Sequence, residues 1–162
     1  MTAATGKSLQ LHCDGIDRTF ELGQAVGRAL VGGEVFALNG PLGAGKTQFV
    51  KAVASGLGYP PRLVCSPSFV LVREYPARLR IYHIDAYRLQ SEAELLALGV
   101  EEMVEPSAVV LLEWAEKVES VLPQNTVTVK MEITGPTSRR VLFSNLPEYL
   151  FGPLRSLANR FV

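Results

Sequence analysis

The feature that most constrains this chain is the stretch NGPLGAGKTQF at residues 39–49, which directly follows a short apolar run. Between Gly40 and Thr47 it matches the pattern G-x-x-x-x-G-K-[ST]. Glycines allow backbone conformations that a Cβ forbids, so successive N–H groups of such a loop can turn toward phosphate oxygens at a helix N-terminus. The stretch therefore predicts a buried strand, a phosphate-binding loop and a helix, in this order.

The residues of the loop divide the contacts that a bound nucleotide needs. We expect Lys46 to reach the β- and γ-phosphates and the Thr47 hydroxyl to bind Mg²⁺. Pro41 has no N–H, but it lies outside the amides that we expect to wrap the phosphates. The alternative, a glycine-rich turn without a ligand, is disfavoured by the strand before the loop and the helix after it. The expected nucleotide-binding residues of the loop are Pro41, Leu42, Gly43, Ala44, Gly45, Lys46, Thr47 and Gln48.

Hydrophobic periodicity predicts strands and helices that alternate along much of the chain. The expected strands are residues 8–13, 34–38, 70–75, 79–85, 109–112, 126–133 and 139–143. The expected helices are residues 19–31, 46–57 and 115–122, a short one from Ser91 to Gly99, and a terminal one striped by Leu150, Leu154, Leu157 and Phe161. The order predicts an α/β fold of the P-loop NTPase type, in which helices flank a mainly parallel sheet and the late hairpin adds antiparallel strands.

The composition is typical of a globular protein and excludes several classes. With 162 residues, of which 48% are hydrophobic and 20% charged, the chain is expected to form one domain over residues 1–162. Lys plus Arg and Asp plus Glu number 16 each, which disfavours autonomous nucleic-acid binding. Neither a signal-peptide core nor a membrane-spanning run is visible, so we expect a cytoplasmic protein. Cys13 and Cys65 form no metal-spaced cluster and are interpreted as incidental thiols.

Two acidic residues close apolar strands, Asp85 in LRIYHID and Glu113 in VVLLE. Each lies at a carboxyl end of the expected sheet, where open α/β folds bind their ligands. Either could be the Mg²⁺ carboxylate, and either could instead only cap the next turn. His83 shares a strand face with Asp85, so it either contacts the site or is a hydrogen-bonded core histidine.

Other polar residues near these strand ends have two interpretations. In the stretch CSPSFVLVREYPA, the hydroxyls of Ser66 and Ser68 can bind Mg²⁺ or the γ-phosphate and order the segment, or the segment is a plain turn into a strand. Arg88 either stabilises phosphoryl charge or forms an ordinary salt bridge. Trp114 is interpreted as a core or interface aromatic rather than a platform for a base.

Four segments, LNGPLGAGKTQF, SPSFVLVREY, HIDAYRL and LLEWAE, resemble in sequence and order the TsaE family of small P-loop ATPases of bacterial tRNA threonylcarbamoyladenosine (t6A) biosynthesis. The resemblance covers residues 22–116 and implies ATP and Mg²⁺ as cofactors. It implies that Thr47, Asp85 and Glu113 serve Mg²⁺, and that Asp85 and Glu113 act in hydrolysis beside Lys46. It also implies that the serine segment acts as a switch.

The resemblance further implies two partner proteins, TsaD and TsaB, which transfer threonylcarbamoyl to adenosine 37 of tRNAs that read ANN codons. The protein would then drive or reset this complex by hydrolysing ATP and reach tRNA only through it. Turnover by the isolated protein is expected to be slow. Two other functions stay open on the sequence: a small-molecule kinase, and a nucleotide-gated interaction module without essential turnover.

Overall fold

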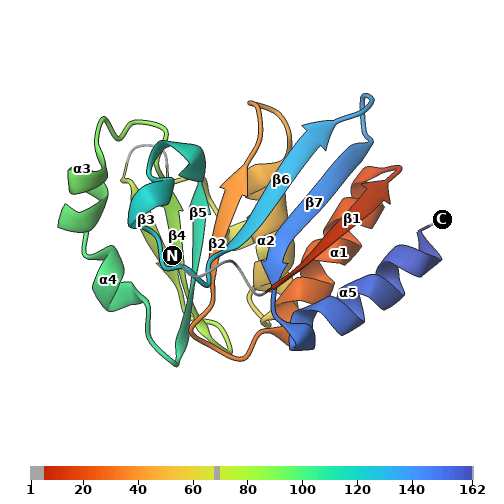
Figure 1. Ribbon diagram of the computed structural model, residues 1–162, viewed down its shortest axis with the longest axis horizontal. Coiled ribbons are helices and arrows are strands. Elements are labelled where there is room, and N and C mark those ends of the chain that lie inside the picture. Colours follow the sequence, from red (N-terminus) through yellow and green to blue (C-terminus); the bar gives the residue numbers. More distant parts are fainter. Residues whose placement is uncertain (1–5, 68–69, 162) are drawn as a thin grey trace.

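The computed structural model describes residues 6–67 and 70–161, which form a seven-stranded sheet with helices on both faces (Figure 1). In space the strands follow the order β1-β7-β6-β2-β5-β4-β3. The strands are β1 (Lys7–Cys13), β2 (Val35–Asn39), β3 (Val72–Tyr75), β4 (Arg80–Asp85), β5 (Ala108–Glu113), β6 (Val127–Ile133) and β7 (Arg139–Leu146). The α-helices are α1 (Ile16–Ala29), α2 (Lys46–Gly56), α3 (Glu92–Ala97), α4 (Val100–Met103) and α5 (Glu148–Arg160).

The middle of the sheet is parallel and both edges are antiparallel. Strands β6, β2, β5 and β4 run in the same direction, while β3 pairs with β4, β7 with β6, and β1 with β7 in antiparallel fashion. The predicted α/β fold, a mainly parallel core with added antiparallel strands, is confirmed. The late hairpin is not their only source, because β1 and β3 also pair antiparallel.

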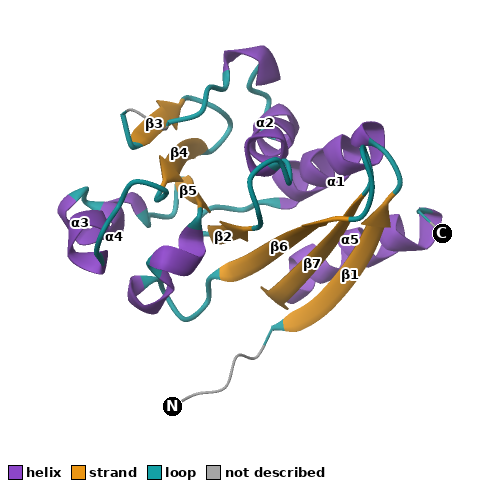
Figure 2. Cartoon of the chain, turned by 90° about the horizontal axis from the view of Figure 1, so that it is seen from above, coloured by secondary structure: helices purple, strands orange, loops and turns teal. Residues whose placement is uncertain are grey.

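Both faces of the parallel core are buried, which explains the continuous apolar runs of its strands. In β2, Phe36 and Leu38 pack into the cluster with α1, α2 and α5, whereas Val35 and Ala37 pack into the cluster with α3 and α4. Seen from above, the two groups of helices lie on opposite sides of the sheet (Figure 2). The predicted covering of both faces therefore holds.

Two local predictions need correction or refinement. Residues 115–122, predicted to be helical, form two 3-10 turns, η2 (Ala115–Lys117) and η3 (Glu119–Val121). The helix fails because the buried Val118 between the turns has an extended φ of −134°, outside the helical region. The predicted capping of α3 is seen, since the Glu94 N–H donates to Ser91 Oγ over 3.3 Å. The helix α4 that follows was not predicted.

The strand directions bring the predicted site residues to one end of the sheet. The loop after β2 lies at the end to which the arrowheads of β2 and β6 point (Figure 1). In the register, Glu113 of β5 is the Cα partner of both Leu38 of β2 and Asp85 of β4. The glycine loop and both acids therefore lie beside one another, although 66 positions separate Thr47 from Glu113. No helix among the described residues is long and apolar enough to cross a membrane.

Candidate functional site

The glycine loop has a backbone that leaves several amides without a partner inside the helix. Gly43 and Gly45 have φ values of 83° and 103°, the left-handed region that favours glycine. The first helical hydrogen bond of α2 runs from the Phe49 N–H to the Gly45 carbonyl. The amides of Lys46, Thr47 and Gln48 thus come before the helical ladder and lie at the positive end of the helix dipole.

The ammonium group of Lys46 lies at the mouth of the loop. It donates to the carbonyl oxygens of Gly40 and Pro41, and it lies 3.7 Å from the ring centroid of Trp114. Burial lowers the pKa of Lys46, while the nearby carboxylates of Glu113 and Asp85 oppose this shift. Uncharged carbonyls and an aromatic face thus hold the Lys46 ammonium. An anion near the loop could replace these contacts.

Thr47 and Glu113 form the closest contact between the loop and a strand end. The Thr47 hydroxyl lies 3.0 and 2.9 Å from the two oxygens of the Glu113 carboxylate. On its other side, Glu113 Oε2 lies 2.6 Å from His83 Nε2, and both side chains are buried. His83 is therefore both of the alternatives that the sequence left open, a hydrogen-bonded core histidine and a contact of the site.

Most of the predicted site residues line one hollow of about 530 Å³ at this end of the sheet. It is lined by Leu42, Gly43, Gly45, Lys46, Thr47, Gln48, Ser66, Asp85, Tyr87, Arg88, Glu113 and Trp114. The buried Ala44 lines an adjoining hollow of about 330 Å³, and its N–H donates to the Pro41 carbonyl. Ser68 lies outside the described residues.

Asp85 has a different local role from Glu113. Its Oδ1 accepts the backbone N–H of Tyr87 over 2.8 Å, so the acid caps the turn after β4 as well as lining the hollow. Glu113 contacts the Thr47 hydroxyl through both of its carboxylate oxygens. Both interpretations of Asp85, capping a turn and facing the site, are therefore compatible with its position.

Three residues of this region were not among the predicted ones. The guanidinium of Arg139, at the start of β7, donates to the carbonyls of Ala44 and Gly43 over 2.8 and 3.0 Å and braces the loop from outside. Tyr87 packs its ring 5.0 Å from that of Trp114. Tyr75 contacts His83 Nδ1 over 3.0 Å. Tyr75 and Tyr87 lie in the segments SPSFVLVREY and HIDAYRL, which could have pointed to them, whereas no local pattern marks Arg139, because it contacts loop residues 95 and 96 positions away.

The oxygen groups at the hollow fit Mg²⁺ bound together with phosphates. No group of three His, Cys, Asp or Glu side chains among residues 6–67 and 70–161 could hold a metal ion alone. Mg²⁺ is usually bound through one or two protein oxygens, substrate phosphates and water, rather than by an all-protein cage. The Thr47 hydroxyl and the Glu113 carboxylate, with Asp85 on the next strand, supply that kind of set.

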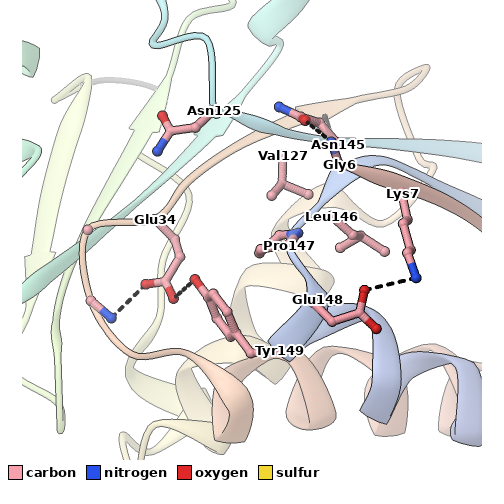
Figure 3. Close-up of a pocket in the computed structure, with 12 residues that line it drawn as sticks. Gly6, Lys7, Glu34, Asn125, Val127, Asn145, Leu146, Pro147, Glu148 and Tyr149 are labelled. Atoms are coloured by element: carbon pink, nitrogen blue, oxygen red, sulfur yellow. Dashed lines mark hydrogen bonds and ion pairs between the residues drawn. The ribbon is translucent and has the colours of Figure 1, made fainter. Parts of the chain in front are cut away.

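A third hollow, of about 440 Å³, lies at the opposite end of the sheet, where β2 and β6 begin (Figure 3). Its buried acid, Glu34, accepts the backbone N–H groups of Val31 and Gly32 over 2.8 and 2.7 Å. The Tyr149 hydroxyl donates to the same carboxylate over 2.8 Å. Backbone amides thus hold this acid in place, which is typical of a structural role.

The sheet and the loop place the molecule among α/β proteins of the P-loop NTPase type. A sequence model of the family described as "Threonylcarbamoyl adenosine biosynthesis protein TsaE" matches residues 13–141. The chain belongs to the TsaE family, whose members are proteins of tRNA threonylcarbamoyladenosine biosynthesis.

Comparison with individual proteins gives the same family. The TsaE protein of Treponema pallidum is 42% identical over 123 residues, 76% of this chain and 90% of the relative. The TsaE protein of Bacillus subtilis is 41% identical over 113 residues, 69% of this chain and 70% of the relative. The crystal structure of YdiB from the same species superposes with a TM-score of 0.78 at 29% identity, covering 98% of this chain and 99% of YdiB.

Proposed function

We propose that this protein is a Mg²⁺-dependent ATPase that acts with TsaB and TsaD in the t6A modification of tRNA without modifying RNA itself. The observation that carries the proposal is the contact of the Thr47 hydroxyl with both oxygens of Glu113 at the mouth of the glycine loop. A hydroxyl and a buried carboxylate at a helix N-terminus are suited to a metal-bound polyphosphate.

The glycine loop would bind the nucleotide. The amides of Lys46, Thr47 and Gln48 face the phosphates as helix N-terminal donors, and Gly43 and Gly45 give the backbone its left-handed turns. Ser66 lines the same hollow and would contact the γ-phosphate or the metal. Thr19 and Phe20 of α1 line the adjoining hollow together with Arg139 and would hold the nucleoside.

The charged side chains would handle the reacting phosphate. Lys46 would exchange the Gly40 and Pro41 carbonyls for the β- and γ-phosphates, an exchange of neutral acceptors for charged ones. Thr47, Asp85 and Glu113 would hold Mg²⁺, which when bound neutralises phosphate charge. Glu113 would also orient the attacking water, while His83 fixes the direction of its carboxylate.

The dependence on partners follows from charge and family. The 16 basic and 16 acidic residues balance, so the chain has no net positive charge with which to hold tRNA. The relatives are named for tRNA threonylcarbamoyladenosine biosynthesis. We therefore expect slow hydrolysis by the isolated protein and faster hydrolysis in a complex with TsaB and TsaD.

Phosphate release from Mg²⁺-ATP, measured for the isolated protein and after addition of TsaB and TsaD, tests this function. The expected result is a rate that rises at least about tenfold with both partners, as for an active site completed by a partner. Release that requires an added small-molecule acceptor would identify a kinase. Modification of tRNA supported equally by ATP and by a non-hydrolysable analogue over many cycles would identify a nucleotide-gated module.

A further inference from the structure

A continuous line of hydrogen-bonding groups leads from Thr47 to the segment that precedes β3. The Thr47 hydroxyl contacts Glu113, and Glu113 Oε2 lies 2.6 Å from His83 Nε2. His83 Nδ1 lies 3.0 Å from the Tyr75 hydroxyl, which in turn lies 2.9 Å from the carbonyl oxygen of Cys65. The Cys65 N–H also donates to the Tyr75 oxygen, over 3.3 Å. Residues from α2, β5, β4 and β3 are thereby linked to one short backbone segment.

We propose that His83 and Tyr75 are positioning residues that couple the direction of the Glu113 carboxylate to the backbone of residues 65–67. This segment carries Ser66, which lines the same hollow as Thr47 and Glu113. The inference rests on the proposed function for the identity of what Glu113 binds, whereas the coupling itself rests on the contacts. If His83 and Tyr75 only filled the core, their hydrogen bonds would not link Glu113 to this segment.

The coupling follows from the number of hydrogens along the line. A carboxylate only accepts, so His83 donates to Glu113 through Nε2, and a neutral ring then accepts at Nδ1. The Tyr75 hydroxyl has one hydrogen and two acceptors in reach, His83 Nδ1 and the Cys65 carbonyl. Burial raises the pKa of Tyr75, so the hydroxyl keeps this hydrogen.

The hydrogen of Tyr75 therefore has two positions, and Glu113 selects between them. While Glu113 accepts from His83, the hydrogen is divided between His83 Nδ1 and the Cys65 carbonyl, which lie 3.0 and 2.9 Å from the Tyr75 oxygen. When Glu113 turns to other ligands, the ring can carry its hydrogen on Nδ1, and Tyr75 then donates to the Cys65 carbonyl. The hydrogen is then no longer divided, so the bond to the Cys65 carbonyl strengthens and holds the segment with Ser66 more tightly.

The surroundings of Tyr75 make it a suitable pivot. Its ring is buried, lies 5.2 Å from the ring of Tyr59, and lies 5.9 Å from that of His83. Replacement by phenylalanine keeps these ring contacts and removes only the hydroxyl. Tyr59→Phe removes a neighbouring hydroxyl outside the line and is the matched control.

The test is a double-mutant cycle read at the Cys65 amide by NMR hydrogen exchange, without nucleotide. Glu113→Ala should slow exchange of this amide by about threefold or more, as expected for contacting residues, because His83 loses its acceptor. The same substitution should change exchange by less than about 1.5-fold in the Tyr75→Phe background. The Tyr59→Phe background should keep the full response. Equal responses in the Tyr75→Phe and wild-type backgrounds, or none in the wild type, would overturn the coupling.

Two further arms separate this inference from the proposed function. His83→Gln interrupts the line of hydrogen bonds between Glu113 and Tyr75, so it should also abolish the response of the Cys65 amide to Glu113→Ala. This variant tests the coupling independently if Tyr75→Phe folds poorly. Addition of Mg²⁺ and a non-hydrolysable ATP analogue should slow Cys65 exchange in the wild type and in Tyr59→Phe, but not in Tyr75→Phe. Absence of nucleotide binding by calorimetry would count against the proposed function, and the nucleotide-free cycle would still decide the coupling.

Discussion

The two ends of the sheet each hold a buried glutamate, and the two acids are held in opposite ways. Glu34, just before β2, is 7% exposed and is bound by two backbone N–H groups and the Tyr149 hydroxyl. Glu113, at the end of β5, is 3% exposed and is bound by the side chains of Thr47 and His83. Burial alone therefore does not distinguish an acid held by backbone amides from one held by side chains.

The difference lies in what the partners can do. Backbone amides in a short loop cannot leave an acid without moving the chain, so Glu34 ties the turn after α1 to β2. A threonine hydroxyl and a histidine ring can rotate or exchange partners, which leaves Glu113 able to take a new ligand. In Figure 3, dashed lines join the Glu34 carboxylate to a backbone N–H and to the Tyr149 hydroxyl. The carboxyl end of the sheet is thus the end suited to chemistry, as is general for open α/β folds.

Replacing one lysine at each end gives the largest expected contrast. Lys46→Ala should weaken binding of Mg²⁺-ATP by about thirtyfold or more, because a lost charge-assisted hydrogen bond costs about 2 kcal/mol. Lys7→Ala removes an exposed ion pair with Glu148 at the other end and should leave nucleotide affinity unchanged. Calorimetric titration of both variants measures the effect. Wild-type affinity in Lys46→Ala would remove the glycine loop from the proposed site.

Converting each buried glutamate to glutamine tests the comparison directly. Glu113→Gln should retain ATP but lower the rate of phosphate release by about a hundredfold, since it removes a group needed mainly in the transition state. Glu34→Gln should lower the free energy of unfolding by about 1–3 kcal/mol, because the new amide NH₂ faces a backbone donor. It should leave phosphate release per folded molecule unchanged. Denaturation and phosphate-release assays on both variants would show the reverse pattern if the two roles were misassigned.

The sequence predicted the parts of this comparison that depend on local patterns. The order of strand, glycine loop and helix could be predicted because the residues that specify it are contiguous around Lys46, and the structure confirms it. Asp85 and Glu113 were predicted to lie at the same end of the sheet because each closes an apolar run, and the parallel pairing of β4 with β5 does place them side by side. The roles assigned to these residues remain predictions.

Tertiary contacts account for what the sequence did not predict. Arg139 braces a loop residue 96 positions away, at Gly43, and no pattern in the chain relates the two. The line through His83 and Tyr75 depends on the antiparallel pairing of β3 with β4. The two turns in place of a helix at residues 115–122 depend on the left-handed Trp114 and on Val118, which are set by packing against the sheet. Glu34 was not singled out, because an acid before a strand carries no sign of its partners.

The smallest expected effect concerns Tyr149, the side-chain partner of Glu34. Burial and the adjacent carboxylate raise the pKa of Tyr149 above its ordinary value near 10. A raised pKa in the folded state means that the associated stability is present below pH 10 and is lost as pH rises above it. Tyr149→Phe should therefore lower the free energy of unfolding by about 1 kcal/mol near neutral pH, the typical worth of one hydrogen bond. Tyr149 is 44% exposed, so solvent keeps the effect modest.

The pH dependence separates this contact from simple packing. Since the variant has no hydroxyl to titrate, its deficit relative to the wild type should shrink as the pH is raised from 8 toward 11, because the wild type alone loses this contribution. Urea denaturation at several pH values measures the difference. If the difference in the free energy of unfolding stayed constant from pH 8 to pH 11, Tyr149 would stabilise this end of the sheet by packing. Backbone amides alone would then fix Glu34.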